Sequence, residues 1–497
     1  MKKAISQLLS GNMLSKVLGL AREVFMAKFF GTGDVNGAYR IAQTGTLVPI
    51  NFMTSDSLNS AFIPLYKKYL TENEFRASTF KLCMFIFFAL VSIAIFIVLY
   101  FLSDYWVGIM APGISGNARE MSTELLKIMA ICCPFYLFSA LINYLSMAHG
   151  DYKPISMRAS IQNVGMLLGV VAAYYFRNYL YLAWGFTGSY IIFSIWALLR
   201  ARKSTILTLP HRFDIVEVKL VSKSFWITLR PLLILPLILQ GNITLERALA
   251  SFISIDVVSG LDYARFITDT VVFILSVPIA FAGLSEWSSQ KPEVVRDKIK
   301  VIYKWLALLV INISFFIFFY AKDLVILLFM RGAFDHHSVA VTTDIIQGMC
   351  IGLWAQVIGY IFIKALSAHL KNKQVLIVMM VALLSNAIVN LVTYKVWGAF
   401  GLGLGNSIYS LMMFILSACY LKIAKDLLPV LIKISIGLVV YTSLILAFGH
   451  YLVEPDNVIL RIMMNGSIFV MFSLIWAMSF PMYRNGIKGI LTKKGLR

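Results

Sequence analysis

Long apolar runs, separated by short charged or turn-rich breaks, fill the sequence from end to end. About 20 consecutive apolar residues span the hydrocarbon core of a bilayer as an α-helix. Windows of that length predict an all-α integral membrane protein with about 14 transmembrane helices. The expected helices are 5–30, 38–63, 80–102, 123–148, 155–176, 179–199, 222–251, 261–285, 301–320, 339–368, 374–394, 399–420, 428–450 and 459–481.

Composition agrees with a membrane protein. Of the 497 residues, 59% are hydrophobic and only 14% are charged, whereas a soluble domain has roughly a quarter charged residues. The net charge of +20 marks cytoplasmic loops in such a chain, so we expect no nucleic-acid partner. The five Cys lie in apolar segments and the six His show no ligand spacing, so neither a disulfide framework nor a metal site is expected.

The basic residues also predict the orientation. With the N-terminus in the cytoplasm, 29 Lys and Arg fall in the inner loops and tails and six in the outer loops. This bias follows the positive-inside rule, so we expect both termini in the cytoplasm. The C-terminal tail agrees through Arg484, Lys488, Lys493, Lys494 and Arg497.

Several charges fall inside the expected helices. A charge at bilayer depth costs at least about 2.5 kcal/mol, so it normally faces a partner or a cavity. Near the expected helix ends, Lys28, Arg40 and Lys127 can reach the interface with their long side chains. The charges that need another explanation are Lys16, Arg22, Arg230, Arg247, Arg265 and Lys364. Because bases outnumber acids there, we expect a cationic cavity that binds an anionic headgroup.

Two of these cations have an acidic neighbour in the sequence. Glu23 adjoins Arg22 and can orient its guanidinium, and Asp269 lies one turn after Arg265, within pairing distance. Arginine suits phosphate because its planar fork donates two parallel hydrogen bonds. The alternative interpretation is that these ions only neutralise one another.

An internal repeat predicts the domain organisation. Residues 123–126 match 343–346, and 146–149 match 366–369, at a constant offset of 220. Two copies of six helices with the same orientation typically form parallel lobes around a substrate cavity. The expected parts are an N-lobe over 1–200, a cytoplasmic linker over 201–221, a C-lobe over 222–422, and two extra helices with a basic tail over 423–497.

Three short motifs carry a family resemblance. Residues 14–23 (LSKVLGLARE), 30–33 (FGTG) and 60–64 (SAFIP) resemble the opening of the MurJ/MviN lipid II flippases, in the multidrug/oligosaccharidyl-lipid/polysaccharide exporter superfamily. The resemblance implies a transporter, not an enzyme, in the bacterial inner membrane. It would move an undecaprenyl-diphosphate-linked glycan to the outer leaflet by alternating access, with membrane lipids and envelope-synthesis proteins as partners.

The resemblance also implies residue roles. The diphosphate-holding positions of the family map directly to Arg22, to Glu23 by an Asp-to-Glu change, and to Lys16 in place of Arg. The family Arg of the eighth helix aligns with Phe266, one residue after Arg265. Together with the sequence argument, the predicted substrate-binding set is Lys16, Arg22, Glu23, Arg247, Arg265 and Asp269.

Other positions depart from the family. Its second-helix Asp falls on Gly37 and its Arg pair falls near Asn51, which indicates a specialised paralogue. Its sodium ligands correspond to Gln240, Asn386 and Asn390, where neutral Asn replaces Asp. We expect no organic cofactor. Transport can be coupled to sodium, to protons or to the membrane potential, and these three stay open. Hydrogen bonding between helices is the other interpretation of the two Asn.

Four alternatives remain at this point. The substrate can be a surface-polysaccharide unit instead of the peptidoglycan precursor. A multidrug antiporter needs an unpaired carboxylate, for which Asp56, Glu246 and Asp269 are candidates. A membrane glycosyltransferase needs acidic residues on a long outer loop, and the outer loops here are short. An inactive scaffold for an envelope-synthesis complex is the fourth.

Overall fold

The computed structural model describes residues 2–202, 205–208, 210, 212, 214–448, 455–481 and 483–484. Every element in this part of the chain is helical, which confirms the all-α fold class. The elements are α1 Lys2–Phe30, α2 Asp34–Met53, α3 Asp56–Glu72, α4 Glu74–Phe101, α5 Ser103–Met110, α6 Gly116–Ala130, α7 Cys132–Ala148, α8 Lys153–Tyr175, α9 Leu180–Ala201, η1 Thr205–Leu207, α10 Ile215–Leu229, η2 Arg230–Leu232, α11 Ile234–Ile253, α12 Ile255–Leu275, α13 Val277–Trp287, α14 Pro292–Phe319, α15 Ala321–Phe329, α16 His336–Ala368, α17 Asn372–Tyr420, α18 Ala424–Phe448 and α19 Val458–Met478. The tail residues Lys488, Lys493, Lys494 and Arg497 lie outside the described residues.

The described helices have membrane-spanning length. Eight are long and apolar enough to cross a bilayer, and the number rises to eleven if each of three bent helix pairs is one span. The bends are 44° between α6 and α7, 51° between α10 and α11, and 40° between α12 and α13. The chain is therefore a multi-pass membrane protein, and the total of fourteen stays a prediction.

Some helix boundaries differ from those expected. The span 38–63 is two helices, because α2 ends at Met53 and α3 begins two residues after Thr54. The helix α12 begins at Ile255, six residues before the expected start at residue 261. The expected pair 374–394 and 399–420 forms one element, α17, with a kink at Gly398, whose φ of +51° is left-handed.

The order of helices is similar in two parts of the chain. In each half a 28-residue helix, α4 or α14, is followed by a helix of eight or nine residues, α5 or α15, and then by a longer span. Asp104 opens α5 and Asp323 opens α15, each within the first turn. Each Asp pairs with an arginine, Arg119 at 2.8 Å and Arg461 at 2.5 Å. The two segments therefore have the same order of helices and the same kind of ion pair, and the internal repeat stays a prediction.

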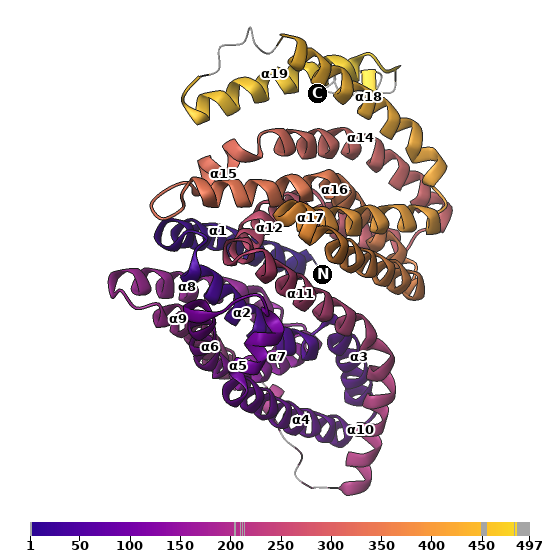
Figure 1. Cartoon of the computed structure of the whole chain (residues 1–497). Helices are drawn as coiled ribbons and strands as arrows, with labels where there is room; N and C mark the ends of the chain where they lie inside the picture. Colours follow the sequence, from indigo (N-terminus) through magenta and orange to yellow (C-terminus); the bar gives the residue numbers. More distant parts are fainter. Residues whose placement is uncertain are drawn as a thin grey trace. The chain divides into compact units, whose positions relative to one another are not determined.

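The chain divides into two compact units. The first comprises Met1–Tyr263 and Arg331–Ser338, and the second comprises Ala264–Met330 and Val339–Arg497. In the first unit α1 packs along α8, α8 along α9, and α2 against α6 and α11 (Figure 1). Gly169 lies so close to Gly185 that a Cβ on Gly169 would stand 2.8 Å from the Gly185 Cα. This close approach of small residues fixes α8, which carries part of the site described below.

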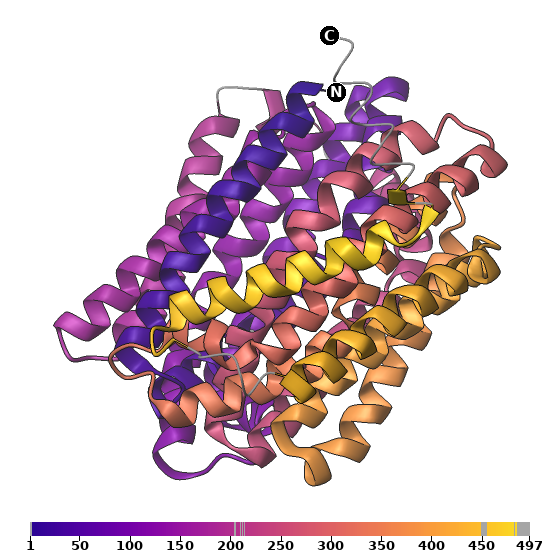
Figure 2. The same cartoon turned by 90° about the horizontal axis from the view of Figure 1, so that it is seen from above.

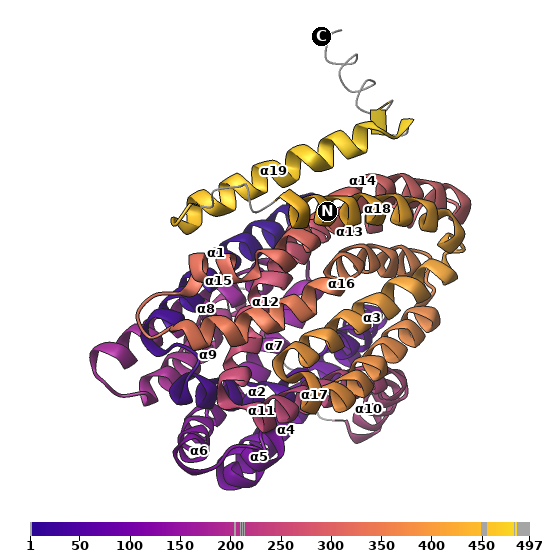
Figure 3. The same cartoon turned by 45° about the horizontal axis from the view of Figure 1, so that its top comes forward.

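In the second unit α14 packs against α18, and both pack against α19 (Figures 2 and 3). Its largest apolar cluster includes the fully buried rings of Trp287, Tyr303 and Phe362. An apolar groove of about 490 Å³ runs between α14 and α19, lined by residues such as Trp305 and Phe469.

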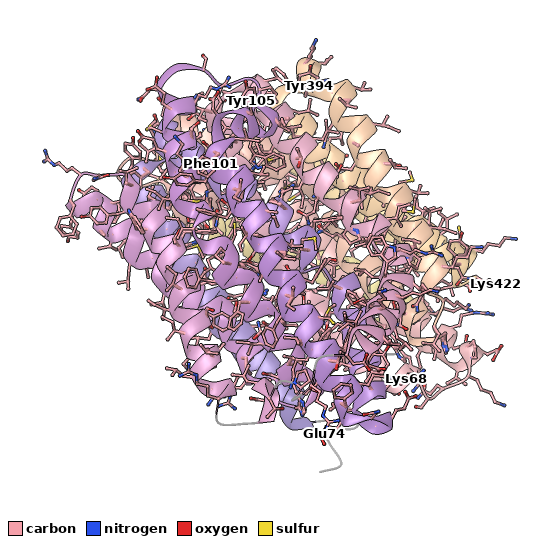
Figure 4. The ribbon with its side chains drawn as sticks, turned by 90° about the horizontal axis from the view of Figure 1, so that it is seen from below. Lys68, Glu74, Phe101, Tyr105, Tyr394 and Lys422 are labelled. Atoms are coloured by element: carbon pink, nitrogen blue, oxygen red, sulfur yellow. The ribbon has the colours of Figure 1, made fainter. Side chains whose placement is uncertain are left out.

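The ends of α4 differ in chemistry. Figure 4 places Lys68 and Glu74 at one end of this helix and Phe101 and Tyr105 at the other. Phe101 and Tyr105 are more than two-thirds exposed. Aromatic side chains gather at membrane interfaces, so this end of α4 is suited to the boundary between lipid and water.

Candidate functional site

The candidate site begins on α1, where Arg22 and Glu23 pair. The Arg22 Nη2 donates to Glu23 Oε1 at 2.5 Å, and its Nε donates to the same oxygen at 3.2 Å. The Arg22 Nη1 donates to the Asn163 Oδ1 on α8 at 2.9 Å. The Arg22 side chain is 17% exposed, whereas Glu23 is 2% exposed. Arg22 therefore keeps an accessible edge while Glu23 is fully enclosed.

A second arginine shares the Glu23 carboxylate. Arg40 on α2 is 3% exposed and donates to both Glu23 oxygens, with a distance of 3.3 Å from its Nη1 to Oε1. Its Nε donates to the Asn36 Oδ1 at 3.1 Å and lies 3.6 Å from the Asp262 Oδ2. The interpretation that Arg40 reaches the membrane interface is therefore wrong, because its guanidinium points into the protein and is paired.

The series continues to α11. The Arg247 Nη2 donates to both Asp262 oxygens, at 2.9 and 3.2 Å, and its Nη1 donates to the Val258 carbonyl at 2.6 Å. We call Arg22, Glu23, Arg40, Asp262 and Arg247 the ion chain. It has three guanidinium groups and two carboxylates, so it carries one positive charge in excess. Such an excess inside membrane helices attracts an anion.

Neutral groups hold the ion chain in place. The Asn36 Nδ2 donates to the Gly31 carbonyl at 2.6 Å and to the Tyr263 hydroxyl oxygen at 2.9 Å. The Tyr263 hydroxyl donates to the same Gly31 carbonyl at 3.1 Å. Gly31 ends α1 with a left-handed φ of +58°, which leaves that carbonyl free to accept both bonds. The Arg40 guanidinium also lies 5.6 Å from the Tyr263 ring centre.

The other three predicted substrate residues are Lys16, Arg265 and Asp269. Lys16 is half-buried on α1, six residues before Arg22 and therefore about 9 Å along the helix axis. Arg265 and Asp269 belong to the part of α12 in the second unit. Of the six predicted substrate residues, the structure joins Arg22, Glu23 and Arg247 in one network.

The predicted ion-coupling residues belong to different units. Asn386 and Asn390 are buried on α17, where the Asn390 Nδ2 donates to the Asn386 Oδ1 at 2.9 Å. The bond joins two residues of one helix, not two helices. Gln240 is 6% exposed on α11 in the first unit. Within the described chain no group of three His, Cys, Asp or Glu is arranged to hold a metal ion.

The structure shows what contacts the two positions that depart from the family pattern, Gly37 and Asn51. A Cβ on Gly37 would stand 2.5 Å from the Ile255 Cδ1, so a carboxylate side chain does not fit there unless the Ile255 side chain moves. Asn51 lies on α2 and accepts a 3.5 Å hydrogen bond from the Tyr136 hydroxyl on α7. The absence of an Asp at position 37 is therefore matched by the packing.

A hydrogen-bonded contact, which we call the α1–loop contact, joins the end of α1 to residues 331–338. The Thr32 Oγ1 donates to the Asp256 Oδ1 at 2.7 Å and lies 2.9 Å from the Ser338 Oγ. The Ala333 N–H donates to the Lys28 carbonyl at 2.8 Å. Residues 331–338 pack in the first unit although the chain on both sides of them belongs to the second.

One carboxylate orders the start of the helix that follows. The Ser338 backbone N–H donates to the Asp335 Oδ1 at 2.8 Å, and the Ser338 hydroxyl donates to it at 2.9 Å. These two hydrogen bonds hold the pKa of Asp335 below its ordinary value. Their contribution is present at neutral pH and is lost as the pH falls through the pKa of the folded state.

Sequence reasoning found Arg22, Glu23 and Arg247 but missed Asp262, Asn36 and Tyr263. Asp262 lies two turns into α12, because that helix starts earlier than its hydropathy indicates. The spacing of Asn36 and Arg40 could have identified Asn36 as a site residue. The two are one turn apart on α2 and therefore share a face.

Multiple membrane helices that enclose an ion-pair network are the features of a polytopic membrane protein with a polar functional site, such as a transporter. The family model described as "Lipid II flippase MurJ" matches residues 26–474. The chain belongs to the MurJ lipid II flippase family, a family of transporters.

Individual relatives agree with the family model. "Probable lipid II flippase MurJ" of Buchnera aphidicola is 24% identical over 396 residues, which are 75% of this chain and 73% of the relative. The protein of that name from Thermotoga maritima is 21% identical and covers 93% of this chain and 94% of its own. The solved structure titled "Lipid II flippase MurJ, inward closed conformation" has a TM-score of 0.82 at 20% identity, over 97% of this chain and 99% of that one. At this identity the structural likeness establishes the shared fold.

Proposed function

We propose that this protein moves an undecaprenyl-diphosphate-linked precursor of the lipid II type from the inner to the outer leaflet of the bacterial cytoplasmic membrane. Its partners are then the lipid-linked glycan, the surrounding membrane lipids and envelope-synthesis proteins. Membership of the MurJ family supports the substrate class. The step itself is transport, with no covalent change to the substrate.

The observation that carries this proposal is the excess cation of the ion chain. Arg40 and Arg247 are each enclosed against a carboxylate, whereas Arg22 combines an ion pair with an accessible edge. A diphosphate at that edge would accept charge-assisted hydrogen bonds from the Arg22 guanidinium. Lys16 lies earlier on the same helix, and Arg265 and Asp269, on α12 in the second unit, are the other proposed substrate residues.

The architecture that goes with this proposal has fourteen spans and both termini in the cytoplasm. Two parallel six-helix lobes, 1–200 and 222–422, are joined by the linker 201–221 and followed by two extra helices in 423–497. Alternation between these lobes would expose the cationic site to one side of the membrane at a time.

The energy source in this proposal does not depend on a dedicated sodium site at Asn386 and Asn390. Their amide groups are neutral and already joined by a hydrogen bond. A neutral pair binds sodium more weakly than a pair with a carboxylate. Coupling to protons or to the membrane potential is therefore the form we favour, with Gln240 as a further polar group.

A surface-polysaccharide unit is the second candidate substrate. The close contact of Gly37 with Ile255 favours it, because the position where the resemblance expects an acid is here packed against an apolar side chain. Both substrates present the same diphosphate to the ion chain and differ only in the glycan.

A multidrug antiporter fits the ion chain less well. Glu23 and Asp262 are both paired with arginines, and a cationic drug would meet the excess positive charge. The side chain of Asp56, another candidate for that role, lies outside the described residues.

Complementation tests the proposed function. The full chain is expressed in a bacterial strain depleted of its own lipid II flippase. We expect growth to be restored by the wild-type chain and by Arg119→Gln, which changes an exposed ion pair. Lack of growth, with the protein present in the membrane, would reject the lipid II substrate. Restored surface polysaccharide in a strain lacking that exporter would then assign the second candidate.

The α1–loop contact gives a prediction about alternating access. Thr32 and Ser338 replaced together by Cys place two thiols where the hydroxyl oxygens are 2.9 Å apart. We expect oxidation to stop transport almost completely, since it ties residues 331–338 to the end of α1, and a reductant to restore it. The disulfide is verified by mass spectrometry. Transport at the wild-type rate by the oxidised double variant would show that this contact persists throughout the transport cycle.

A further inference from the structure

Arg158, in the first unit, has no anionic partner among the described residues. Arg158 lies on α8, a candidate membrane span, about 7.5 Å from the start of that helix. It is half-buried, and in the described chain neither a carboxylate nor a hydrogen-bond acceptor contacts its guanidinium. The three arginines of the ion chain all have a carboxylate partner. A charge at this depth without a counter-ion indicates a missing ligand.

The Arg158 guanidinium lies over an aromatic ring. The Arg158 Cζ lies 5.6 Å from the ring centre of Tyr136 on α7. The ring of Tyr190 on α9 contacts that of Tyr136, with 4.8 Å between ring centres and 30° between the ring planes. A cation–π contact attracts the charge but satisfies none of the N–H donors, which need acceptor oxygens.

A second unsatisfied donor lies one turn further along α8. The Gln162 Nε2 is buried with no hydrogen-bond partner, and the residue is 9% exposed. Four residues apart on a helix, Arg158 and Gln162 share a face. On the neighbouring α7, Asn143 is 1% exposed and both its amide atoms lack a partner. Asn143 is seven residues after Tyr136, so these two also share a face.

The unsatisfied groups define the chemistry of the ligand. The guanidinium and the Gln162 amide are donors, so the complementary ligand is rich in acceptor oxygens and negatively charged. A phosphate group meets both conditions, and arginine holds it with a planar fork. Unpartnered buried amides in a native protein are uncommon and call for a ligand or ordered water.

The position on α8 connects this group to the ion chain. Asn163, which accepts a hydrogen bond from Arg22, is five residues after Arg158 and therefore about 7.5 Å along the same helix axis. Residues 149–152 join the end of α7 to the start of α8. Arg158 therefore lies near the side of the membrane on which this loop lies. In the proposed orientation that face is cytoplasmic, where the precursor enters.

We propose that Arg158, Gln162 and Tyr136 form a second phosphate-binding site, which receives the diphosphate on the cytoplasmic side before it reaches Arg22. The identity of the ligand rests on the proposed flippase function, whereas the anion chemistry of the site does not. Two sources can supply the phosphate: the diphosphate of the lipid-linked precursor, or the headgroup of a bulk anionic phospholipid.

Binding in nanodiscs of neutral lipid tests this inference. Undecaprenyl diphosphate and phosphatidylglycerol are titrated separately against the full chain in an Arg22→Gln background, so that the remaining binding reports the second site. Adding Arg158→Gln is expected to weaken undecaprenyl diphosphate binding at least about tenfold, with a smaller loss for Arg158→Lys. The matched control is Arg200→Gln, because Arg200 near the same membrane face already pairs with Asp151 at 2.8 Å.

The outcomes separate the two proposals. Weaker binding of phosphatidylglycerol alone would support the anion site and assign it to bulk lipid. Unchanged binding of both probes in Arg158→Gln and in Gln162→Leu, with both variants folded, would overturn the inference. No binding of undecaprenyl diphosphate to the wild-type chain would instead reject the proposed substrate, and the phosphatidylglycerol titration would still report on Arg158.

Discussion

Arg22→Gln is expected to lower the rate of lipid flipping at least about a hundredfold while the protein stays folded. Without Arg22, the ion chain has two guanidinium groups and two carboxylates, so its excess positive charge is gone. Glu23 keeps Arg40 as a partner, and the new amide can still reach Asn163. The variant therefore removes the anion site without leaving a buried charge unpaired.

The flipping rate is measured in proteoliposomes with a fluorescent undecaprenyl-diphosphate-linked sugar and a membrane-impermeant quencher. Arg119→Gln is the matched control, since its exposed pair with Asp104 is far less enclosed and it should flip at the wild-type rate. A wild-type rate in Arg22→Gln would contradict the role of the excess charge.

Glu23→Gln, unlike Arg22→Gln, is expected to lower the stability of the fold strongly. Glu23 is 2% exposed and is shared by Arg22 and Arg40. Its neutralisation leaves three guanidinium groups with the single carboxylate of Asp262, and removing one partner of a buried pair costs about 3–5 kcal/mol. We expect a lower thermal unfolding temperature and a lower yield of folded protein in detergent.

The comparison that decides this prediction is the Glu23→Gln, Arg22→Gln double variant. It has two guanidinium groups and one carboxylate, so it should recover part of the lost stability. Equal unfolding temperatures for the wild-type chain and Glu23→Gln would mean that the ion chain does not support the fold.

The helical membrane fold was predictable because apolar runs of spanning length are a strong signal. The ends of the helices were less predictable, and they decide whether a charge of the site is placed inside a helix or at its end. Charges near the start of a helix lower the local hydropathy, which moves the apparent start inward. Arg40 and Asp262 were therefore placed at helix ends, although α2 starts at Asp34 and α12 at Ile255.

The partners of these charges were even less accessible to sequence reasoning. Glu23 lies 17 residues before Arg40, and Asp262 lies 15 residues after Arg247, on different helices. Local spacing cannot reveal such pairs, since they depend on how α1, α2, α11 and α12 pack. Arg158 was missed for the first reason, since it lies only three residues after the expected helix start at 155.

The most direct test is photo-crosslinking next to Arg22. The Arg22 Nη1 lies 3.4 Å from the Met166 Sδ, so a photoreactive residue at position 166 samples the space beside this guanidinium. We predict a crosslink to a labelled undecaprenyl-diphosphate lipid that is suppressed by excess undecaprenyl diphosphate and weakened by Arg22→Gln. Equal suppression by undecaprenol, which has no phosphate, together with an undiminished crosslink in Arg22→Gln would contradict a diphosphate site at Arg22.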